Sequence, residues 1–288
     1  MKDIKQRIAN IRSTGQIIKA MDMIASTKLH KARAQLEGVR PIYNELKRRV
    51  EEVGAHEEAD NHAFYQERVV KSSLYVVLTS DRGFAGGFNA NITLTALEHM
   101  EQGKNEKLIV VGSKGDRFFR KRNKNIIKKI TDVSDAHMYY GTESIAKMLE
   151  DLYLTGEVDE VFVAYTQFEN ILSYVPYVER VLPVVTTAPD IKHSSFKIYE
   201  PDIHTYIDHI MPLYLHMCLF RAFSESHTSE QAARMVSMDV AGKNANEMIE
   251  KLSLMFNRRR QAAITQELSE IVGSASILNK NKGGIHDG

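Results

Sequence analysis

Residues 1–53 read MKDIKQRIANIRSTGQIIKAMDMIASTKLHKARAQLEGVRPIYNELKRRVEEV and contain a seven-residue repeat. Such a repeat slightly underwinds an α-helix and keeps one stripe of side chains against a partner helix in a left-handed supercoil. The segment therefore predicts a long helix that packs against another helix of similar length. Apart from Gly15 and Asp22, the repeat positions are apolar: Ile4, Ile8, Ile11, Gly15, Ile18, Asp22, Ala25, Leu29, Ala32, Leu36, Val39, Tyr43, Leu46, Val50 and Val53.

The other end of the chain supplies the predicted partner helix. No further proline occurs between about Pro212 and Leu278, and apolar residues again recur in steps of four and three. The interval from Phe256 to Ile264 shifts the phase, which predicts a local change in the supercoil. The recurring residues are Ala245, Ile249, Leu252, Phe256, Ile264, Leu268, Ile271, Ala275 and Leu278.

Two places are predicted to depart from regular helix. Pro41 follows Gly38 inside the first helical segment, and proline removes a backbone donor and clashes with the preceding turn, so we expect a kink or a local break there. The tail from Asn279 to Gly288 is rich in Asn, Lys and Gly, which favours disorder.

The middle of the chain has the pattern of an α/β domain. Short apolar runs at Leu74–Leu78, Leu108–Val111 and Val161–Tyr165 are typical of buried parallel strands. Weaker strands are predicted at 126–133 and 178–185, the second at a sheet edge because of Pro183. Helices are predicted at 90–102, 116–124 and 142–155, so strands and helices alternate. The predicted organisation is a discontinuous coiled-coil rod, 1–70 and 199–288, with a Rossmann-like α/β domain at 71–198.

Composition places bounds on the function. The 288 residues carry a formal charge of +1, so no global field indicates nucleic acid or an acidic substrate. Residues 1–50 nevertheless hold twelve Lys and Arg against four acids, which fits either a solvated helix face or an acidic partner. Cys218, the single cysteine, lies in an apolar run and predicts a buried, inert thiol. We find no secretory signal and no run of about 20 apolar residues that could span a bilayer.

The glycine-rich loop after the first strand does not match a nucleotide-binding motif. Gly83, Gly86 and Gly87 do not fit the dinucleotide pattern, and no Walker sequence is present. The histidines lack the spacing of a metal site, and no local pattern supports a nucleophile with its base. The sequence therefore predicts no catalytic residue, no metal and no cofactor, and a structural turn or a partner contact at this loop.

Five motifs follow one another in the order and spacing of a known family. They are IKAMDMIASTKLHKAR (18–33), LTSDRGFAGGFNANI (78–92), VPYVERVLPV (175–184), SEQAARMVSMDVAGKNANEMI (229–249) and RRRQAAITQELSEIVGSAS (258–276). With these motifs the chain resembles, over almost its whole length, the γ subunit of the F-type ATP synthase. Ala85 and Asp239 depart from the family pattern, which commonly has Cys and Lys there.

The resemblance implies a non-catalytic central rotor. In the family, the two terminal helices form an antiparallel coiled coil that enters a hexamer of α and β subunits, while the α/β domain lies with the ε subunit and the membrane-embedded c-ring. Rotation of the coil couples ion flow through the c-ring to ATP synthesis or hydrolysis at the β subunits. The implied location is the cytoplasmic side of a bacterial plasma membrane, reached only through the c-ring. The alternative is a nucleotide- or NAD-dependent Rossmann enzyme with a helical dimerisation arm.

The resemblance also implies which residues contact the β subunit. Lys19, Met21 and Met23 match the family's K-A-M-x-M segment, where the coil meets β. Arg234, Arg260, Gln261 and Thr265 match positions that contact β or stabilise the coil near that contact. Residues 80–89 match the loop after the first strand, which is taken as structural.

Overall fold

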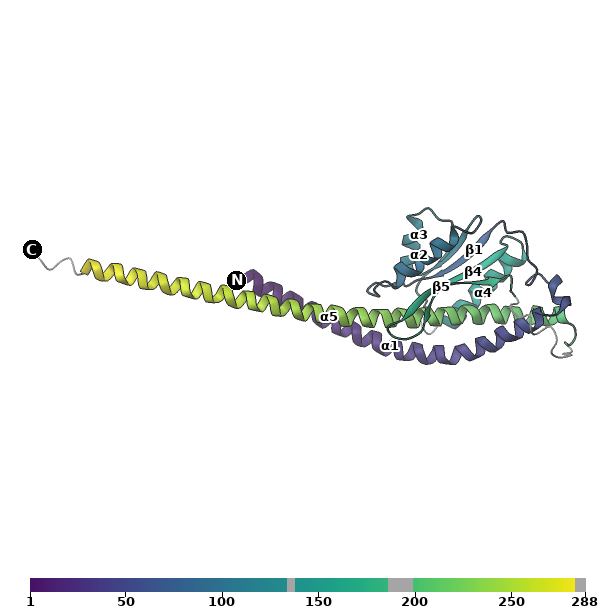
Figure 1. Cartoon of the computed structure of the whole chain (residues 1–288), viewed down its shortest axis with the longest axis horizontal. Helices are drawn as coiled ribbons and strands as arrows, with labels where there is room; N and C mark the ends of the chain where they lie inside the picture. Colours follow the sequence, from purple (N-terminus) through teal and green to yellow (C-terminus); the bar gives the residue numbers. More distant parts are fainter. Residues whose placement is uncertain (134–137, 186–198, 283–288) are drawn as a thin grey trace, which may run out of the picture. The chain divides into compact units, whose positions relative to one another are not determined.

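The computed structural model describes residues 1–133, 138–185 and 199–282, with side chains up to residue 273 (Figure 1). Two long helices enclose an α/β domain in the sequence, so the predicted fold class is confirmed. The first helix, α1 (Lys2–Gly54), has 53 residues, and the last, α5 (Ile203–Lys282), has 80. The described residues between them form a short 3-10 helix, η1 (Glu57–Asn61), five strands and three further helices.

The heptad prediction for α1 is confirmed by burial. Each of the fifteen repeat positions is buried or half-buried, including Gly15 and Asp22. Of the kink or local break predicted at Pro41, the break is wrong, because α1 continues through this residue, and the kink stays a prediction. Proline in a helix interior costs about 3 kcal/mol, and the buried side chains of Val39 and Tyr43 on either side offset this loss by packing.

The last helix begins nine residues before the predicted start and contains Pro212. Asp202 caps it: the backbone N–H of Thr205 donates to Asp202 Oδ1 at 2.9 Å, and the Thr205 hydroxyl donates to Oδ2 at 2.8 Å. At the other end the helix continues to Lys282, so the disorder predicted from Asn279 onward is wrong for its first four residues. Residues 283–288 lie outside the described chain.

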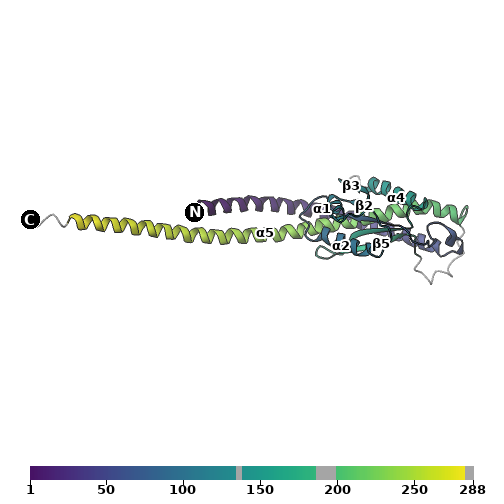
Figure 2. The ribbon, with the colours of Figure 1, turned by 90° about the horizontal axis from the view of Figure 1, so that it is seen from above.

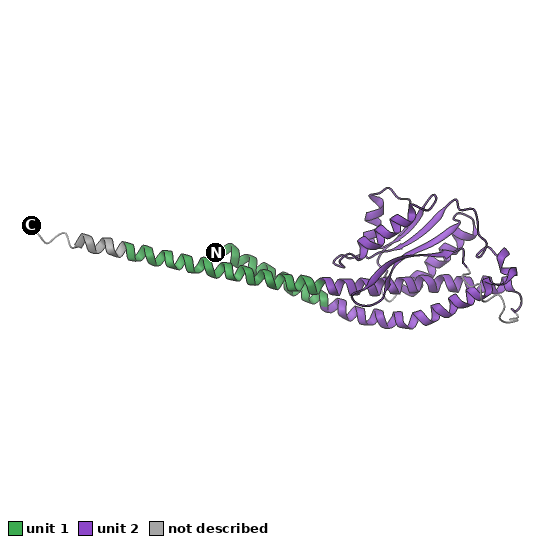
Figure 3. Cartoon of the chain, in the orientation of Figure 1, with its two compact units in different colours: residues 1–22, 238–288 green, residues 23–237 purple. Residues whose placement is uncertain are grey.

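The chain divides into two compact units (Figure 3). Unit 1 contains Met1–Asp22 and Met238–Gly288, and unit 2 contains Met23–Ser237. This division groups residues that lie close to one another. It does not test the predicted boundaries between the rod and the inserted domain at residues 70 and 199, which stay a prediction.

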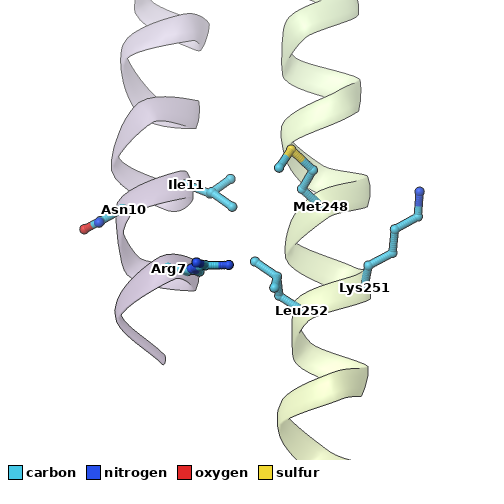
Figure 4. A pocket seen from close by; sticks show the side chains of 6 residues that line it. All are labelled: Arg7, Asn10, Ile11, Met248, Lys251 and Leu252. Atoms are coloured by element: carbon cyan, nitrogen blue, oxygen red, sulfur yellow. The ribbon is translucent and has the colours of Figure 1, made fainter. Parts of the chain in front are cut away.

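Unit 1 is an antiparallel pair of helical segments from α1 and α5. Ile18 Cγ2 lies 3.8 Å from the place that a Cβ on Gly242 would occupy, which sets the register. Arg7 and Ile11 point across the pair toward Leu252 and Met248, whereas Asn10 and Lys251 point away from it (Figure 4).

In this register, α5 continues beyond the N-terminus of α1 (Figures 1 and 2). Ile264, Leu268 and Ile271 are therefore 47%, 57% and 63% exposed. The prediction that this stretch of the heptad pattern pairs with the first helix is wrong. Ile264 and Leu268 lie beyond the end of α1 and face no other helix of the part of the chain that the structure describes.

Unit 2 contains a five-stranded sheet in the order β3-β2-β1-β4-β5. Four strands are parallel, and only β5 runs antiparallel, beside β4. The predicted core of parallel strands is confirmed. The edge strand predicted at 178–185 is confirmed for residues 178–182, which lie in β5. The strands are β1 (Ser73–Leu78), β2 (Lys107–Val111), β3 (Ile126–Ile130), β4 (Glu160–Phe168) and β5 (Tyr174–Leu182).

Two hydrophobic cores cover the two faces of the sheet. One holds β-strand residues with Ile92 and Met100 of α2 (Phe88–Met100) and Phe119 of α3 (Ser113–Arg120). The other joins the sheet to α4 (Met138–Leu154), α5 and the second half of α1. Cys218 is fully buried in the second core, and burial raises the pKa of its thiol to about 12, as expected for an inert cysteine.

No helix in the described part of the chain is long and apolar enough to cross a bilayer.

Candidate functional site

The loop after β1 is held together by its own side chains. Both carboxylate oxygens of Asp81 accept backbone N–H groups, from Ser113 at 2.8 Å and from Asp132 at 2.9 Å. The backbone N–H of Ser80 donates to Asn89 Oδ1 at 2.9 Å. A Rossmann enzyme uses free N–H groups at helix N-termini to bind phosphate. Here the N–H at the start of α3 is bonded to a carboxylate, whose negative charge repels a phosphate at that helix end.

Arg234 of α5 holds the same loop from the other side. Its side chain is 9% exposed and forms an ion pair with Glu230 at 2.5 Å. Both Nε and Nη2 donate to the carbonyl oxygen of Gly83 at 3.4 Å. The loop also approaches α5 at Gly86, where φ is +52° and an added Cβ would lie 2.9 Å from Ser237 Oγ. The structure therefore places Arg234 at an internal contact between α5 and the loop.

The K-A-M-x-M segment lies on α1 with mixed exposure. Lys19 is exposed and Met21 is half-buried in unit 1. In unit 2, Met23 is 64% exposed, as is the neighbouring Ile24 at 58%. Large exposed apolar side chains beside each other are typical of surfaces that bind a partner.

Arg260, Gln261 and Thr265 lie on α5 where it passes the end of α1. All three are exposed. The Thr265 hydroxyl donates to the Gln261 carbonyl of its own helix at 2.9 Å, whereas the Arg260 guanidinium has no partner among the described residues. In the antiparallel register, Arg260 is opposite the first residues of α1, so it lies roughly 27 Å along the coil from Lys19. The predicted contact residues around Lys19 and those around Arg260 thus lie at two separate positions along the coil.

A buried polar cluster that was not predicted from the sequence joins the helices to the sheet. Arg221 of α5 forms an ion pair with Glu179 of β5 and donates to the Tyr165 hydroxyl at 2.7 Å. The Tyr43 hydroxyl of α1 donates to Glu179 Oε1 at 3.0 Å. The available signal was a lone charge, Arg221, directly after the apolar run LYLHMCLF.

A second missed cluster joins the same elements farther along the strands. Arg40 of α1 forms an ion pair with Glu225 of α5 at 2.8 Å, and the Glu225 side chain is only 2% exposed. Buried charges of this kind require a partner. The partners are 185 positions apart in the sequence, which hides the pair from local patterns.

The described residues contain no group of three His, Cys, Asp or Glu side chains that could hold a metal ion.

Known proteins match the chain over almost all of its length. The sequence profile of the family described as ATP synthase matches residues 1–278. The ATP synthase gamma chain of Moorella thermoacetica is 42% identical over 279 residues, which cover 96% of this chain and 99% of the relative. The chain belongs to the ATP synthase gamma-chain family. Another member, from Acetobacterium woodii, is described as sodium ion specific and is 35% identical over 301 residues, with 97% and 99% coverage.

Chains in solved structures of ATP synthases share this fold. A chain of the Euglena gracilis mitochondrial ATP synthase, from a complex of OSCP, F1 and c-ring, matches with a TM-score of 0.72 at 16% identity, covering 100% of this chain and 97% of that one. A chain from the central stalk and c-ring of the Tetrahymena thermophila enzyme matches with a TM-score of 0.61 at 23% identity, covering 78% and 99%.

Proposed function

We propose that this chain is the central rotor subunit of an F-type ATP synthase. The main evidence is that the chain belongs to the gamma-chain family, with an alignment that covers 96% of its length. Two features of the described chain support the assignment: a two-helix coil fused to an α/β domain, and an α5 whose apolar stripe continues past the end of α1. The enzyme alternative is not favoured, because the relatives are gamma chains.

In this role the chain couples ion flow to ATP chemistry without catalysing either step. The catalytic sites lie on the β subunits, and the coil rotates within the hexamer of α and β subunits. The α/β domain lies with the ε subunit and the c-ring. The complex is peripheral F1 on the cytoplasmic side of a bacterial plasma membrane, and the chain reaches the membrane only through the c-ring. We retain the division into a rod, 1–70 and 199–288, and a domain, 71–198.

We propose two direct contacts with the β subunit and one supporting residue. Lys19, Met21 and Met23 form one contact, supported by the exposure of Lys19 and Met23. Arg260, Gln261 and Thr265 form the other, supported by an Arg260 guanidinium that is free within the described chain. Arg234 supports the coil near the first contact by holding Gly83, rather than by reaching the β subunit itself.

The assignment is tested by co-expressing a tagged chain with α and β subunits. We expect a stable complex whose ATP hydrolysis turns a bead attached to the α/β domain. As a control, the tagged chain is purified alone and dialysed against ATP and against NAD, and no micromolar binding is expected. Failure to co-purify with α and β subunits, or tight nucleotide binding by the isolated chain, would overturn the assignment.

A further inference from the structure

The far end of strand β4 lacks a strand neighbour on one side. Strand β1 pairs with β4 only from Ser73↔Glu160 to Val77↔Ala164. On its other side β4 pairs with β5 along its whole remaining length, as far as Phe168↔Tyr174. In a strand, the N–H and C=O of one residue point to the same side. The backbone groups of Thr166 and Phe168 that point away from β5 therefore need other partners.

Side chains from the two long helices supply these partners. The Thr166 N–H donates to Ser226 Oγ at 3.0 Å, and Ser229 Oγ donates to the Thr166 carbonyl at 3.2 Å. The Phe168 N–H donates to Glu225 Oε2 at 2.8 Å, and Arg40 Nη2 donates to the Phe168 carbonyl at 2.6 Å. Each backbone group on that side of the strand end thus has a side-chain partner, as it would have in a further strand. We call Arg40, Glu225, Ser226 and Ser229 the strand-end clamp.

Three of the four clamp residues are buried, and Arg40 is partly exposed, with 39% of its side chain accessible. Glu225, Ser226 and Ser229 are at most 7% exposed, and Phe168 is 5% exposed. Arg40 binds Glu225 through both Nε and Nη2, at 2.8 and 2.9 Å, so its guanidinium is fixed as a planar fork while it also reaches Phe168. Water is excluded from Glu225, Ser226 and Ser229, which makes their polar bonds stronger than bonds on the surface, whereas Arg40 is reached by solvent on one side.

The clamp lies far from the two places where the chain connects the sheet to the long helices. The chain passes between helix and sheet twice, from Gly54 to Ser73 and from Leu182 to Ile203. Both passages are at the same end of the sheet, because Leu182 pairs with Val161 at the start of β4. Phe168 is seven residues farther along β4, or roughly 23 Å at the usual rise of a strand. No covalent link holds the sheet to the helices there.

We infer that the strand-end clamp transmits torque between the α/β sheet and the two long helices. This inference rests on the proposed rotor function. The hydrophobic core, the Arg221–Glu179 pair and the packing of Phe168 on Leu36 and Ala232 also hold the sheet to the helices. The clamp adds polar bonds at the end of β4 that is farthest from the two covalent connections, where a force on the sheet has the longest lever arm. With the clamp, the far end of β4 follows α1 and α5 as one body. Arg40 and Glu225 are therefore positioning residues for the coupling of rotation, beyond any contact with the β subunit.

The experiment measures torsional stiffness in the assembled complex. The α and β hexamer is fixed to a surface, and a bead is attached to a cysteine introduced at the exposed Lys121, since Cys218 is buried. Angular fluctuations of the bead are recorded without nucleotide. The test variant is Arg40→Met with Glu225→Met. It removes two of the four bonds to the strand end, so the angular variance is expected to rise, but by less than twofold, because the hydrophobic packing of Phe168 and the Arg221–Glu179 pair remain.

Two control variants separate torque transmission from stability. Arg33→Met with Glu37→Met removes an exposed Arg–Glu pair within α1, which joins no second element, and should leave the variance unchanged. Ile92→Ala opens a cavity between α2 and the sheet, away from the clamp, and lowers the melting temperature. If Ile92→Ala raises the variance as much as the clamp variant does, the clamp has only a structural role and the inference is wrong.

The remaining outcomes identify which proposal fails. A wild-type complex that rotates, together with a clamp variant as stiff as the wild type, overturns the clamp inference alone. A wild-type chain that gives no rotation with α and β subunits overturns the rotor assignment and this inference together. Glu225→Gln keeps an acceptor for the Phe168 N–H, so its variance is expected to lie between those of the wild type and the double variant.

Discussion

Single residues in unit 2 fix the loops that surround the carboxyl ends of the strands. Gly112 lies between β2 and α3 with φ at +91°, and an added Cβ would lie 2.3 Å from the carbonyl oxygen of Thr79. The Thr79 hydroxyl in turn donates to the Val111 carbonyl at 2.7 Å and accepts the Gly115 N–H at 2.9 Å. Backbone atoms cannot move away as a flexible side chain could, so this position accepts only glycine.

We expect Gly112→Ala to destabilise the isolated chain by at least about 3 kcal/mol, from a positive φ and a backbone clash together. Gly156→Ala is the matched control, because Gly156 has φ at +75° but nothing within 4 Å of an added Cβ. Its cost should be about 1–2 kcal/mol from the backbone conformation alone. Urea unfolding gives both values, and equal losses would show that the predicted clash is relieved.

Asp202 makes the start of α5 sensitive to acid. Hydrogen bonds from Thr205 hold the pKa of Asp202 below its usual value of 3.8. Its contribution to stability is therefore fully present above the unfolded pKa and is lost as pH falls through the lower folded pKa. We expect Asp202→Asn to be slightly less stable than the wild type at pH 7 and equal to it near pH 2. Thermal unfolding at the two pH values checks this, and a gap that persists in acid would contradict the assigned cap.

At the scale of elements, α5 has parts with very different surroundings. Residues 207, 211, 215, 218 and 222 are buried to 0% exposure in the core of unit 2. Leu268 and Val272 of the same helix are 57% and 68% exposed. Most helix stability in proteins comes from packing of an apolar face rather than from propensity. The two parts should therefore differ in local stability although both are helical.

We expect backbone amides of residues 260–273 to exchange hydrogen much faster than those of residues 210–230 in the isolated chain. Assembly with α and β subunits should slow exchange in 260–273, since the exposed stripe gains a partner. Hydrogen exchange followed by mass spectrometry measures both states. Equal protection of the two segments in the isolated chain would mean that residues 260–273 already have a partner, such as a second copy of the chain.

At the scale of the whole molecule, function depends on contacts that the chain makes outside itself. The formal charge of +1 hides two basic segments: residues 1–50, with twelve Lys and Arg against four acids, and residues 113–130, with eight against Asp116 alone. The first belongs to the coil and the second to α3 and β3. When basic segments face acidic surfaces of a partner, they increase the rate at which the two proteins associate and favour the correct relative orientation.

The double variant Arg260→Ala, Gln261→Ala tests the second proposed β contact. A charge-assisted hydrogen bond contributes about 1.5–3 kcal/mol, so loss of one made in a single rotational state should slow turnover about tenfold or more. Arg258→Ala, an exposed arginine of the same run, should have little effect. The assay is ATP hydrolysis by the reconstituted complex, with circular dichroism to verify the helix. Wild-type turnover in an assembled double variant would show that these residues are only a solvated helix face.

The local elements of this protein could be predicted from the sequence because their signals are local. The heptad stripe of α1, the apolar runs of β1, β2 and β4, and the buried state of Cys218 each follow from periodicity or hydrophobicity over a few neighbouring residues. The family motifs could be recognised for the same reason. The proposed contact residues Lys19, Met23 and Arg260 came from these motifs and lie on exposed helix faces.

The register of the coil and the strand-end clamp were decided by the tertiary structure. A heptad repeat resembles itself after every seven residues, so it cannot determine where α1 stops along α5 or that Ile264 and Leu268 are left exposed. The pairing of Arg40 with Glu225 depends on how the sheet is inserted between two helices that are distant in sequence. Likewise Pro41 and Pro212 signal helix ends locally, and both are overruled by the packing of the residues around them.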